Sequence, residues 1–421
     1  MRVLRSLSSF VFNLVLARML GAGGTGSYFL ALGVTQLATQ AARFGMDPMV
    51  VRLFAGGEGR SRVVYGRVLA LVLVVGLLMT GMLLAAAPFL CVTLFGETAL
   101  IEPLRIMALG IVPGALAYLH GSFLQSTGKI GLSILVHYVA LFVTGIPFLL
   151  LAGKGGIEGA ALAHVAASVS TLAIGVWLWR LTVDTAFTLS NHDLAPGRWR
   201  EVVGASLSLC SIGLLTAASG LADTFLLGAL GTMEDVGTFR VAFRIAVLGG
   251  AALEVVRAVI APRMAAHYSD GDWYALERTG RAGTALSILL TLPYWFVVLL
   301  FPRQVLGIFG SEFTAATTAT VILIFARMIA TFTGPVGTLL AMTGLERPLR
   351  NLTIVVTVMR IVLLAVVIPV WGVLGVAVVG CLSEIIAGVA ATVLSRQRLG
   401  IAVLPLPRSV LSYRADQVRT H

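Results

Sequence analysis

The chain has 421 residues, of which 58% are hydrophobic and only 12% are charged. A soluble domain averages roughly 45–50% apolar and about 25% charged residues, so the composition excludes a soluble enzyme, a disordered chain and a disulfide scaffold. The net charge of +11 comes from basic residues that lie between long apolar runs, which favours a membrane topology over nucleic-acid binding.

Apolar runs near the length of a membrane-spanning helix, about 20 residues, follow one another along the chain. They predict an all-α polytopic membrane protein with twelve transmembrane helices in two parallel six-helix lobes. The predicted domains are an N-terminal lobe at 1–179, a cytoplasmic linker at 180–201, a C-terminal lobe at 202–399 and a cytoplasmic tail at 400–421. The expected spans are 4–20, 26–43, 66–90, 100–125, 130–152, 157–179, 202–230, 236–261, 280–302, 315–342, 352–371 and 375–395.

The distribution of basic residues orients these spans. When the N-terminus is placed in the cytoplasm, most loop Lys and Arg residues fall on the cytoplasmic side. The opposite side holds only Arg18, Arg105, Lys154 and Arg303. This asymmetry predicts that both termini are cytoplasmic. A cleaved signal peptide is not expected, because no small-x-small cleavage site follows the first apolar run. The shortness of the first span leads us to expect further residues before Met1.

An internal repeat relates the two halves. Segment 66–96 aligns with segment 280–310 without a gap, so that the Gly-Arg start, a proline (Pro88 and Pro302) and the Phe-Gly end all coincide. Such self-similarity indicates tandem units. Because six spans is an even number, both halves run the same way through the bilayer, as in transporters that bind substrate between two parallel repeats.

The glycine-rich stretch at 21–26 fits the pattern G-x-G-x-x-G, and Asp47 follows about twenty residues later. A dinucleotide-binding site requires a strand before this pattern and a βαβ unit around it. Here an apolar span precedes the pattern and another follows it, so we interpret it as a tight turn between two helices.

Charged residues inside the second-half spans are the most informative feature, because a charge at the bilayer centre costs about 2.5–3.5 kcal/mol on insertion scales. Four arginines form the cationic wall that we expect for binding a multiply charged anion, since guanidinium groups bind phosphate oxygens bidentately. The alternative is that Arg360 with Glu384, and Arg327 with a neighbour, are structural ion pairs. The acids are expected to couple transport to a proton or sodium ion, or to be counter-ions. The set comprises Arg240, Arg244, Arg327, Arg360, Asp223, Glu254 and Glu384, with Glu254 expected near the helix face of Arg240 and Arg244.

Other polar residues carry no recognisable chemistry. The histidines (His120, His137 and His164) lie in neighbouring spans without i, i+4 spacing, so we expect helix-packing hydrogen bonds rather than a metal site or a proton relay. The cysteines (Cys91, Cys210 and Cys381) match no metal or redox spacing. No Walker A loop or nucleophile elbow occurs, so the sequence predicts no metal, no cofactor and no enzymatic reaction.

Four short stretches carry a family resemblance. They are LARMLGAGGTGSY at 16–28, AARFGMD at 41–47, LADTFLLGALG at 221–231 and VGTFRVA at 236–242. Together with the repeat and the expected spans, they resemble the Wzx-type oligosaccharide and polysaccharide flippases of the multidrug/oligosaccharidyl-lipid/polysaccharide (MOP) superfamily, whose fold is that of the MATE transporters.

The resemblance implies a two-lobed carrier in the bacterial inner membrane. It would move an undecaprenyl-diphosphate-linked oligosaccharide, such as an O-antigen or exopolysaccharide repeat unit, between leaflets by alternating access. The implied partners are this lipid-linked oligosaccharide diphosphate, membrane lipids, and the polysaccharide polymerase and glycosyltransferases of the pathway. Related flippases use arginines of the first two spans, which places Arg18 and Arg43 among the implied substrate-binding residues.

Two other functions fit parts of the pattern. A cation-coupled multidrug exporter of the same superfamily would keep acids in its first spans, whereas none occurs between Leu4 and Ala42. A membrane glycosyltransferase or polymerase would carry a sizeable outer loop with catalytic residues, whereas the longest linker, 180–201, is predicted to be cytoplasmic. The flippase is therefore the favoured interpretation.

Overall fold

The computed structural model describes residues 2–55, 61–152, 155–186, 196–401 and 403. The described residues form helices and contain no β-strand. They fall into two compact units, which we call unit 1 (Met1–Gly237) and unit 2 (Thr238–His421). The predicted all-α membrane fold is confirmed, whereas most of the predicted tail and the middle of the predicted linker lie outside the described residues.

The described residues of unit 1 form nine α-helices of different length and the first residues of α10 (Met233–Leu248). The α-helices are α1 (Arg2–Ala42), α2 (Met46–Ala55), α3 (Arg62–Phe89), α4 (Ile101–Ala108), α5 (Ile111–Ser126), α6 (Ile130–Ile134), α7 (Ala140–Ala152), α8 (Gly156–Ala186) and α9 (Pro196–Leu230). Short helical turns lie between them at η1 (Leu90–Leu94), η2 (Thr98–Leu100) and η3 (Leu135–Val139).

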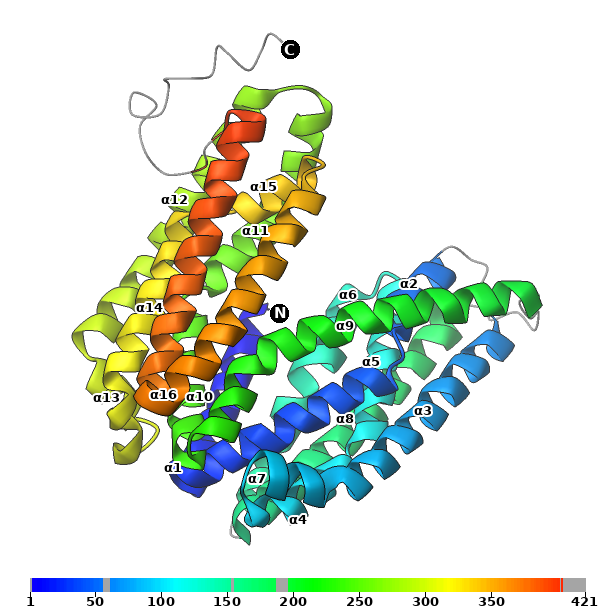
Figure 1. Cartoon of the computed structure of the whole chain (residues 1–421). Coiled ribbons are helices and arrows are strands. Elements are labelled where there is room, and N and C mark those ends of the chain that lie inside the picture. The colour runs from blue at the N-terminus through cyan, green and yellow to red at the C-terminus, as the bar shows by residue number, and fades with distance from the viewer. Residues whose placement is uncertain (1, 56–60, 153–154, 187–195, 402, 404–421) are drawn as a thin grey trace. The chain divides into compact units, whose positions relative to one another are not determined.

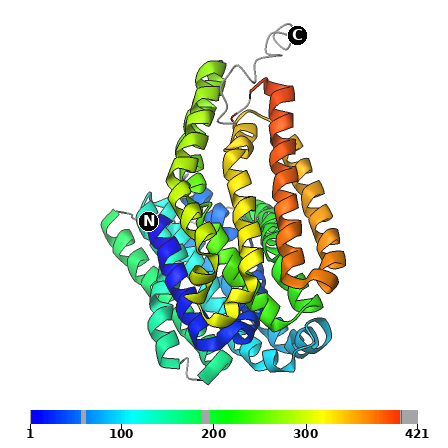
Figure 2. The ribbon, with the colours of Figure 1, turned by 90° about the vertical axis from the view of Figure 1, so that its left-hand side faces the viewer.

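Unit 2 contains the remaining helices. They are most of α10 (Met233–Leu248), then α11 (Ala251–Ser269), α12 (Trp273–Leu300), α13 (Pro302–Gly307), α14 (Thr317–Phe332), α15 (Val336–Met342) and α16 (Glu346–Leu399), with a helical turn at η5 (Ser311–Ala316). Within this unit, α12, α14 and α16 stand side by side (Figures 1 and 2).

Local sequence signals set several helix boundaries. The Ser61 hydroxyl accepts hydrogen bonds from the amides of Val63 and Val64 at the start of α3, and the Asp272 carboxylate accepts one from the Ala275 amide at the start of α12. Both are N-cap interactions that satisfy otherwise unpaired amides. Gly400 ends α16 in the left-handed conformation, which glycine adopts without a Cβ penalty.

Glycines interrupt the two longest helices. Non-helical dihedral angles occur at Gly21 in α1 and at Gly372 in α16. Figure 1 shows the two segments of α16, orange and red, meeting at a sharp reversal. Each break falls between two expected spans, and a 54-residue helix would be about 80 Å long, far more than one crossing of an apolar layer about 30 Å thick.

Within the described residues, eight helical stretches are long and apolar enough to cross a membrane, or ten when each of two bent helix pairs is one span. One bent pair joins Thr98–Ala108 to Ile111–Ser126 and the other joins α10 to α11, each with an angle of 45°. The protein is therefore a multi-pass membrane protein. The count of twelve spans is not confirmed and stays a prediction.

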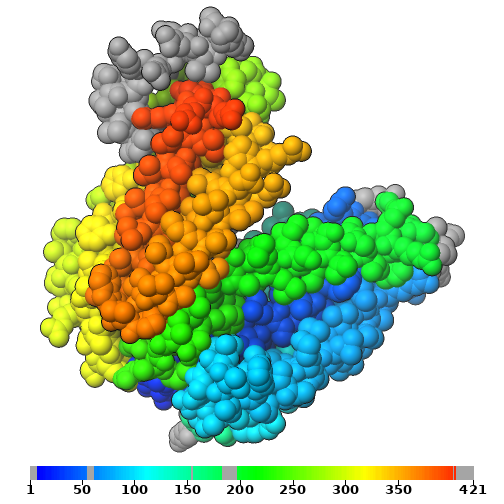
Figure 3. All heavy atoms as spheres, viewed as in Figure 1, coloured from blue at the N-terminus to red at the C-terminus, as the bar shows by residue number. Residues whose placement is uncertain are grey.

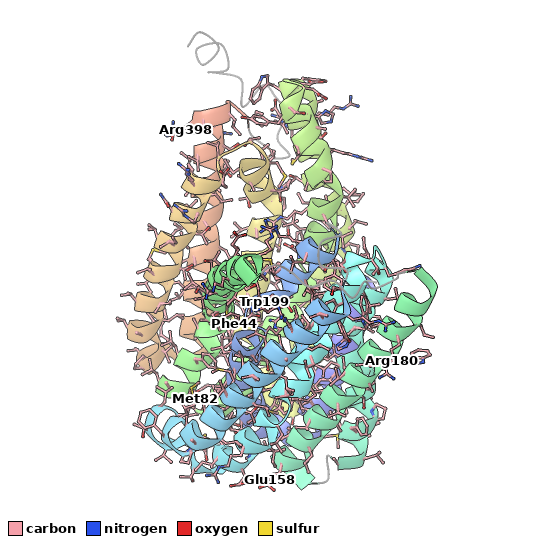
Figure 4. The ribbon with its side chains drawn as sticks, turned by 90° about the vertical axis from the view of Figure 1, so that its right-hand side faces the viewer. Phe44, Met82, Glu158, Arg180, Trp199 and Arg398 are labelled. Atoms are coloured by element: carbon pink, nitrogen blue, oxygen red, sulfur yellow. The ribbon has the colours of Figure 1, made fainter. Side chains whose placement is uncertain are left out.

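Unit 1 has a continuous apolar core in which α9 lies along α1, as the green and blue surfaces of Figure 3 show. The seventh expected span, 202–230, thus belongs to the same compact unit as the first six, although the predicted lobe boundary lies earlier, in the 180–201 linker. Glu158 and Arg180 lie toward opposite ends of α8 (Figure 4). The division into two six-helix lobes stays a prediction.

Candidate functional site

An ion pair lies inside the apolar helices of unit 2. The Arg327 guanidinium on α14 is 3.1 Å from the Glu384 carboxylate on the second segment of α16, and the two side chains are 28% and 33% exposed. The guanidinium carbon also lies 5.7 Å from the centre of the Phe243 ring on α10. Three helices therefore meet around one charged pair.

Arg360 lies on the first segment of α16 and is partly buried. One terminal nitrogen of its guanidinium would lie 3.9 Å from a Cβ added to Gly380, on the second segment. The Arg360 guanidinium therefore lies next to Gly380, where the two segments of α16 are close together. The expected pairing alternatives included Arg360 with Glu384, but the ion pair that Glu384 forms in the structure is with Arg327.

Arg240 and Arg244 both lie on α10 and are partly buried. Because they are four residues apart on one unbroken helix, they share a face, as predicted. The end of α10 is held against α12, where the Tyr294 hydroxyl donates a 2.5 Å hydrogen bond to the Ile245 carbonyl oxygen. Both arginines therefore lie on a helix that is hydrogen-bonded to α12 near its C-terminal end.

Glu254 lies on a different helix from Arg240 and Arg244. The helix breaks at Gly249 and Gly250, so Glu254 lies in the first turn of α11, beyond a 45° bend. Its side chain is 66% exposed and pairs with Arg257 at 2.8 Å. The expected position of Glu254 near the face of Arg240 and Arg244 assumed one continuous helix, and it stays a prediction across this bend.

Two predicted residues of unit 1 differ sharply in exposure. Arg18 is exposed on α1, three residues before the break at Gly21. Asp223 lies within α9 and is only 6% exposed. In unit 2, Glu384 pairs with Arg327. Arg240, Arg244 and Arg360 are also partly buried, so cations outnumber acids among the partly buried charges of the described part of that unit.

A second charged cluster lies in unit 1 around Arg43. Its guanidinium is 2.6 Å from the Asp47 carboxylate, with side chains 16% and 18% exposed, and lies 4.3 Å from the centre of the Tyr118 ring. Sequence analysis included Arg43 but missed Asp47 and Tyr118 as its partners. The spacing of four residues gave no signal, because the backbone between Arg43 and Asp47 is a turn with positive φ angles rather than a helix.

Two histidines join helices of unit 1. The Tyr65 hydroxyl is 3.0 Å from His120 Nε2, and His137 Nε2 is 2.8 Å from the Tyr118 carbonyl oxygen. These contacts are the helix-packing hydrogen bonds expected for both residues. Among the described residues, no group of three or more His, Cys, Asp or Glu side chains could hold a metal ion.

Comparison with known families identifies two matches. Residues 1–267 match the family model described as "Polysaccharide biosynthesis protein", and residues 210–371 match the model described as "MatE". A curated relative, described as a probable low-salt glycan biosynthesis flippase of Haloferax volcanii, is 26% identical over 162 residues, which are 38% of this chain and 34% of the relative. The chain therefore matches about one third of that relative's length.

Solved structures show the same fold. An inward-facing multidrug resistance MATE transporter of the MOP superfamily superposes with a TM-score of 0.76 at 16% identity, over 94% of each chain. A MOP superfamily transporter from Pyrococcus furiosus, described as having a binding pocket of reversed polarity, superposes with a TM-score of 0.68 at 18% identity, over 95% of this chain and 94% of the other. The fold is that of the MATE transporters.

Proposed function

The chain belongs to the polysaccharide biosynthesis protein family, and on that premise we propose that it is a lipid-linked oligosaccharide flippase. Its substrate is an undecaprenyl-diphosphate-linked oligosaccharide, an O-antigen or exopolysaccharide repeat unit. The protein moves it across the bacterial inner membrane by alternating access, with both termini in the cytoplasm, and performs no covalent chemistry. The glycan biosynthesis flippase among its relatives supports this assignment.

The observation that carries the proposal is the set of partly buried arginines in unit 2. Arg240 and Arg244 share a face of α10, while Arg327 and Arg360 lie on α14 and α16. Guanidinium stays protonated and offers a planar fork of donors that matches phosphate oxygens. Since intramembrane charges are costly to keep, this cationic excess favours a multiply charged anion such as a diphosphate.

In this proposal Arg240 and Arg244 hold the diphosphate, and Arg327 and Arg360 contribute to its binding. Arg18 and Arg43 of unit 1 contribute as the family resemblance implies. Glu384 competes for Arg327 at 3.1 Å, which suits a residue that couples substrate binding to an ion or proton. Asp223 and Glu254 are the other coupling candidates, and the exposed position of Glu254 makes it the weaker one.

A cation-coupled multidrug exporter is the second candidate function. The match of residues 210–371 to the MatE model and the similarity to multidrug resistance transporters favour it. The excess of embedded arginines speaks against it, because a cationic drug would be repelled by that charge.

The test is binding of undecaprenyl diphosphate, with and without a short glycan, and of a cationic dye to the purified protein. The double variant Arg240→Ala, Arg244→Ala should weaken binding of the diphosphate lipid by at least about 10-fold, which corresponds to about 1.4 kcal/mol. The matched control is Arg347→Ala, Arg350→Ala, which removes two exposed charges from the start of α16. Preferential dye binding, insensitive to Arg240 and Arg244, would instead support the multidrug exporter.

A further inference from the structure

The turn between α1 and α2 brings Arg43 and Asp47 together. Phe44 and Gly45 both have positive φ angles, of 52° and 67°, and Figure 4 labels Phe44 at this turn. A Cβ on Gly45 would overlap the Ser206 carbonyl oxygen on α9. Only glycine fits there, so the turn is pressed against α9 and its geometry is fixed.

The ion pair in this turn is incomplete. The contact joins Arg43 Nη1 to Asp47 Oδ2 at 2.6 Å. Arg43 Nε and Asp47 Oδ1 are buried and have no hydrogen-bond partner in the part of the chain that the structure describes. Buried polar atoms are nearly always satisfied, and a guanidinium–carboxylate pair is frequently bidentate. The observed pair therefore leaves a donor that a second acceptor can use.

Tyr118 on α5 fixes the guanidinium independently of the carboxylate. Its ring lies 4.3 Å from the guanidinium carbon, a favourable cation–π geometry. The His137 ring lies 5.1 Å from the Tyr118 ring. His137 is itself held between the Tyr118 carbonyl oxygen at 2.8 Å and the Ser133 hydroxyl at 3.2 Å. The aromatic surface under Arg43 is thus positioned by neighbouring helices rather than by Asp47.

We propose that Asp47 is an internal competitor for substrate, a carboxylate that occupies Arg43 until the phosphate oxygens of the anionic lipid replace it. This inference rests on the proposed function. It adds that Asp47 controls when Arg43 is available to the substrate. Tyr118 is the positioning residue that keeps the guanidinium in place during the exchange. Binding of the diphosphate then satisfies the Arg43 Nε donor, and the Asp47 carboxylate is released.

The direction in which one substitution changes the affinity for the lipid distinguishes this role from a structural one. Asp47→Asn removes the competing charge while keeping the shape of the side chain, so undecaprenyl diphosphate in detergent micelles should bind about tenfold more tightly than to the unsubstituted protein. The same substitution in an Arg43→Gln background should produce no gain, because the contested donor is absent.

A matched control is available in unit 2. Glu277 and Arg281 form an ion pair of the same spacing and the same 2.6 Å distance, with side chains 19% and 20% exposed. Glu277→Gln therefore removes the same charge from an equivalent pair and should leave binding unchanged. An equal gain in both variants would show a nonspecific effect of net charge and would overturn the proposal.

The tyrosine gives a second measurement if the Asp47 variant does not fold. Tyr118→Phe should retain binding, because the aromatic face is kept, whereas Tyr118→Leu should weaken it several-fold. Unchanged or weaker binding by Asp47→Asn, with normal binding by the unsubstituted protein, would refute the competitor role alone. Absence of binding by the unsubstituted protein would refute the proposed function and this inference with it.

Discussion

Gly26 of α1 lies close against the backbone of the first turn of α10. A Cβ on Gly26 would overlap the Met233 carbonyl oxygen and lie 2.9 Å from the Gly237 amide nitrogen. A Cβ on Gly237 would in turn overlap the Ala22 carbonyl oxygen and lie 3.0 Å from the Gly26 amide nitrogen. Substitution of either glycine by alanine must therefore push two backbones apart.

The magnitude follows from this geometry. Separating the helices by about 1 Å disturbs the packing on both sides, and overpacking of this kind costs typically about 1–3 kcal/mol, and occasionally more. Alanine returns about 1 kcal/mol through its higher helix propensity. Because the obstructing atoms are backbone rather than flexible side chains, we expect the upper end of that cost and a net loss of about 2 kcal/mol for Gly26→Ala.

The assay is thermal unfolding of the purified protein in detergent, followed by tryptophan fluorescence. Gly23→Ala, one turn earlier on α1, is the control, because nothing lies within 4 Å of its Cβ. It should be neutral or slightly stabilising. The double variant Gly26→Ala, Gly237→Ala should lose less than the sum of the two single losses, since one separation accommodates both methyl groups. Equal stability of the Gly26 and Gly23 variants would refute the reasoning.

Three further outcomes are expected. Glu384→Gln should lower the unfolding temperature, because it removes the charged acceptor 3.1 Å from Arg327 and costs about 1–2 kcal/mol; Glu312→Gln on η5, exposed in the same unit, is the control. Tyr65→Phe should cost about 1 kcal/mol through loss of the 3.0 Å hydrogen bond to His120, while Tyr268→Phe, at an exposed position on α11, should cost nothing measurable. Thr284→Val should destabilise unit 2 by about 1 kcal/mol, because the buried Thr284 hydroxyl donates to the Val403 carbonyl oxygen at 2.9 Å, and exposed Thr216→Val is its control. A loss no larger than that of the matching control would contradict each expectation.

Hydropathy predicted the helices well because each expected span needs only a sufficiently long apolar run. The gap between the expected spans 4–20 and 26–43 contains the observed break at Gly21, and the gap between 352–371 and 375–395 contains the break at Gly372. The predicted MOP-superfamily resemblance is likewise confirmed by the family match and the MATE fold.

Bends inside an apolar run were not predictable in the same way. The run 236–261 continues through Gly249 and Gly250 without a change in hydropathy, yet the helix bends there by 45°. The periodicity places Arg240 and Arg244 on one face of α10, but it cannot be extended across the bend to Glu254. Helical spacing holds only while the helix is unbroken.

Sequence spacing also cannot predict which charged side chains on different helices pair with each other. Arg327 and Arg360 are on different helices, and nothing in the sequence indicates which of them reaches Glu384. The two partners of Arg43 could not be predicted from sequence spacing either. Asp47 lies four residues away but across a turn with positive φ angles rather than along a helix, and Tyr118 reaches the guanidinium only through tertiary packing.

Lipid transfer between leaflets is the most direct test of the central claim. The purified protein is reconstituted into vesicles containing a fluorescent undecaprenyl-diphosphate-linked oligosaccharide in both leaflets, and dithionite, which does not cross the bilayer, is added outside. A flippase should allow quenching to proceed well beyond the roughly one half seen in protein-free vesicles, and the Arg240→Ala, Arg244→Ala variant should not. Quenching that stops at one half with the unsubstituted protein would contradict the account.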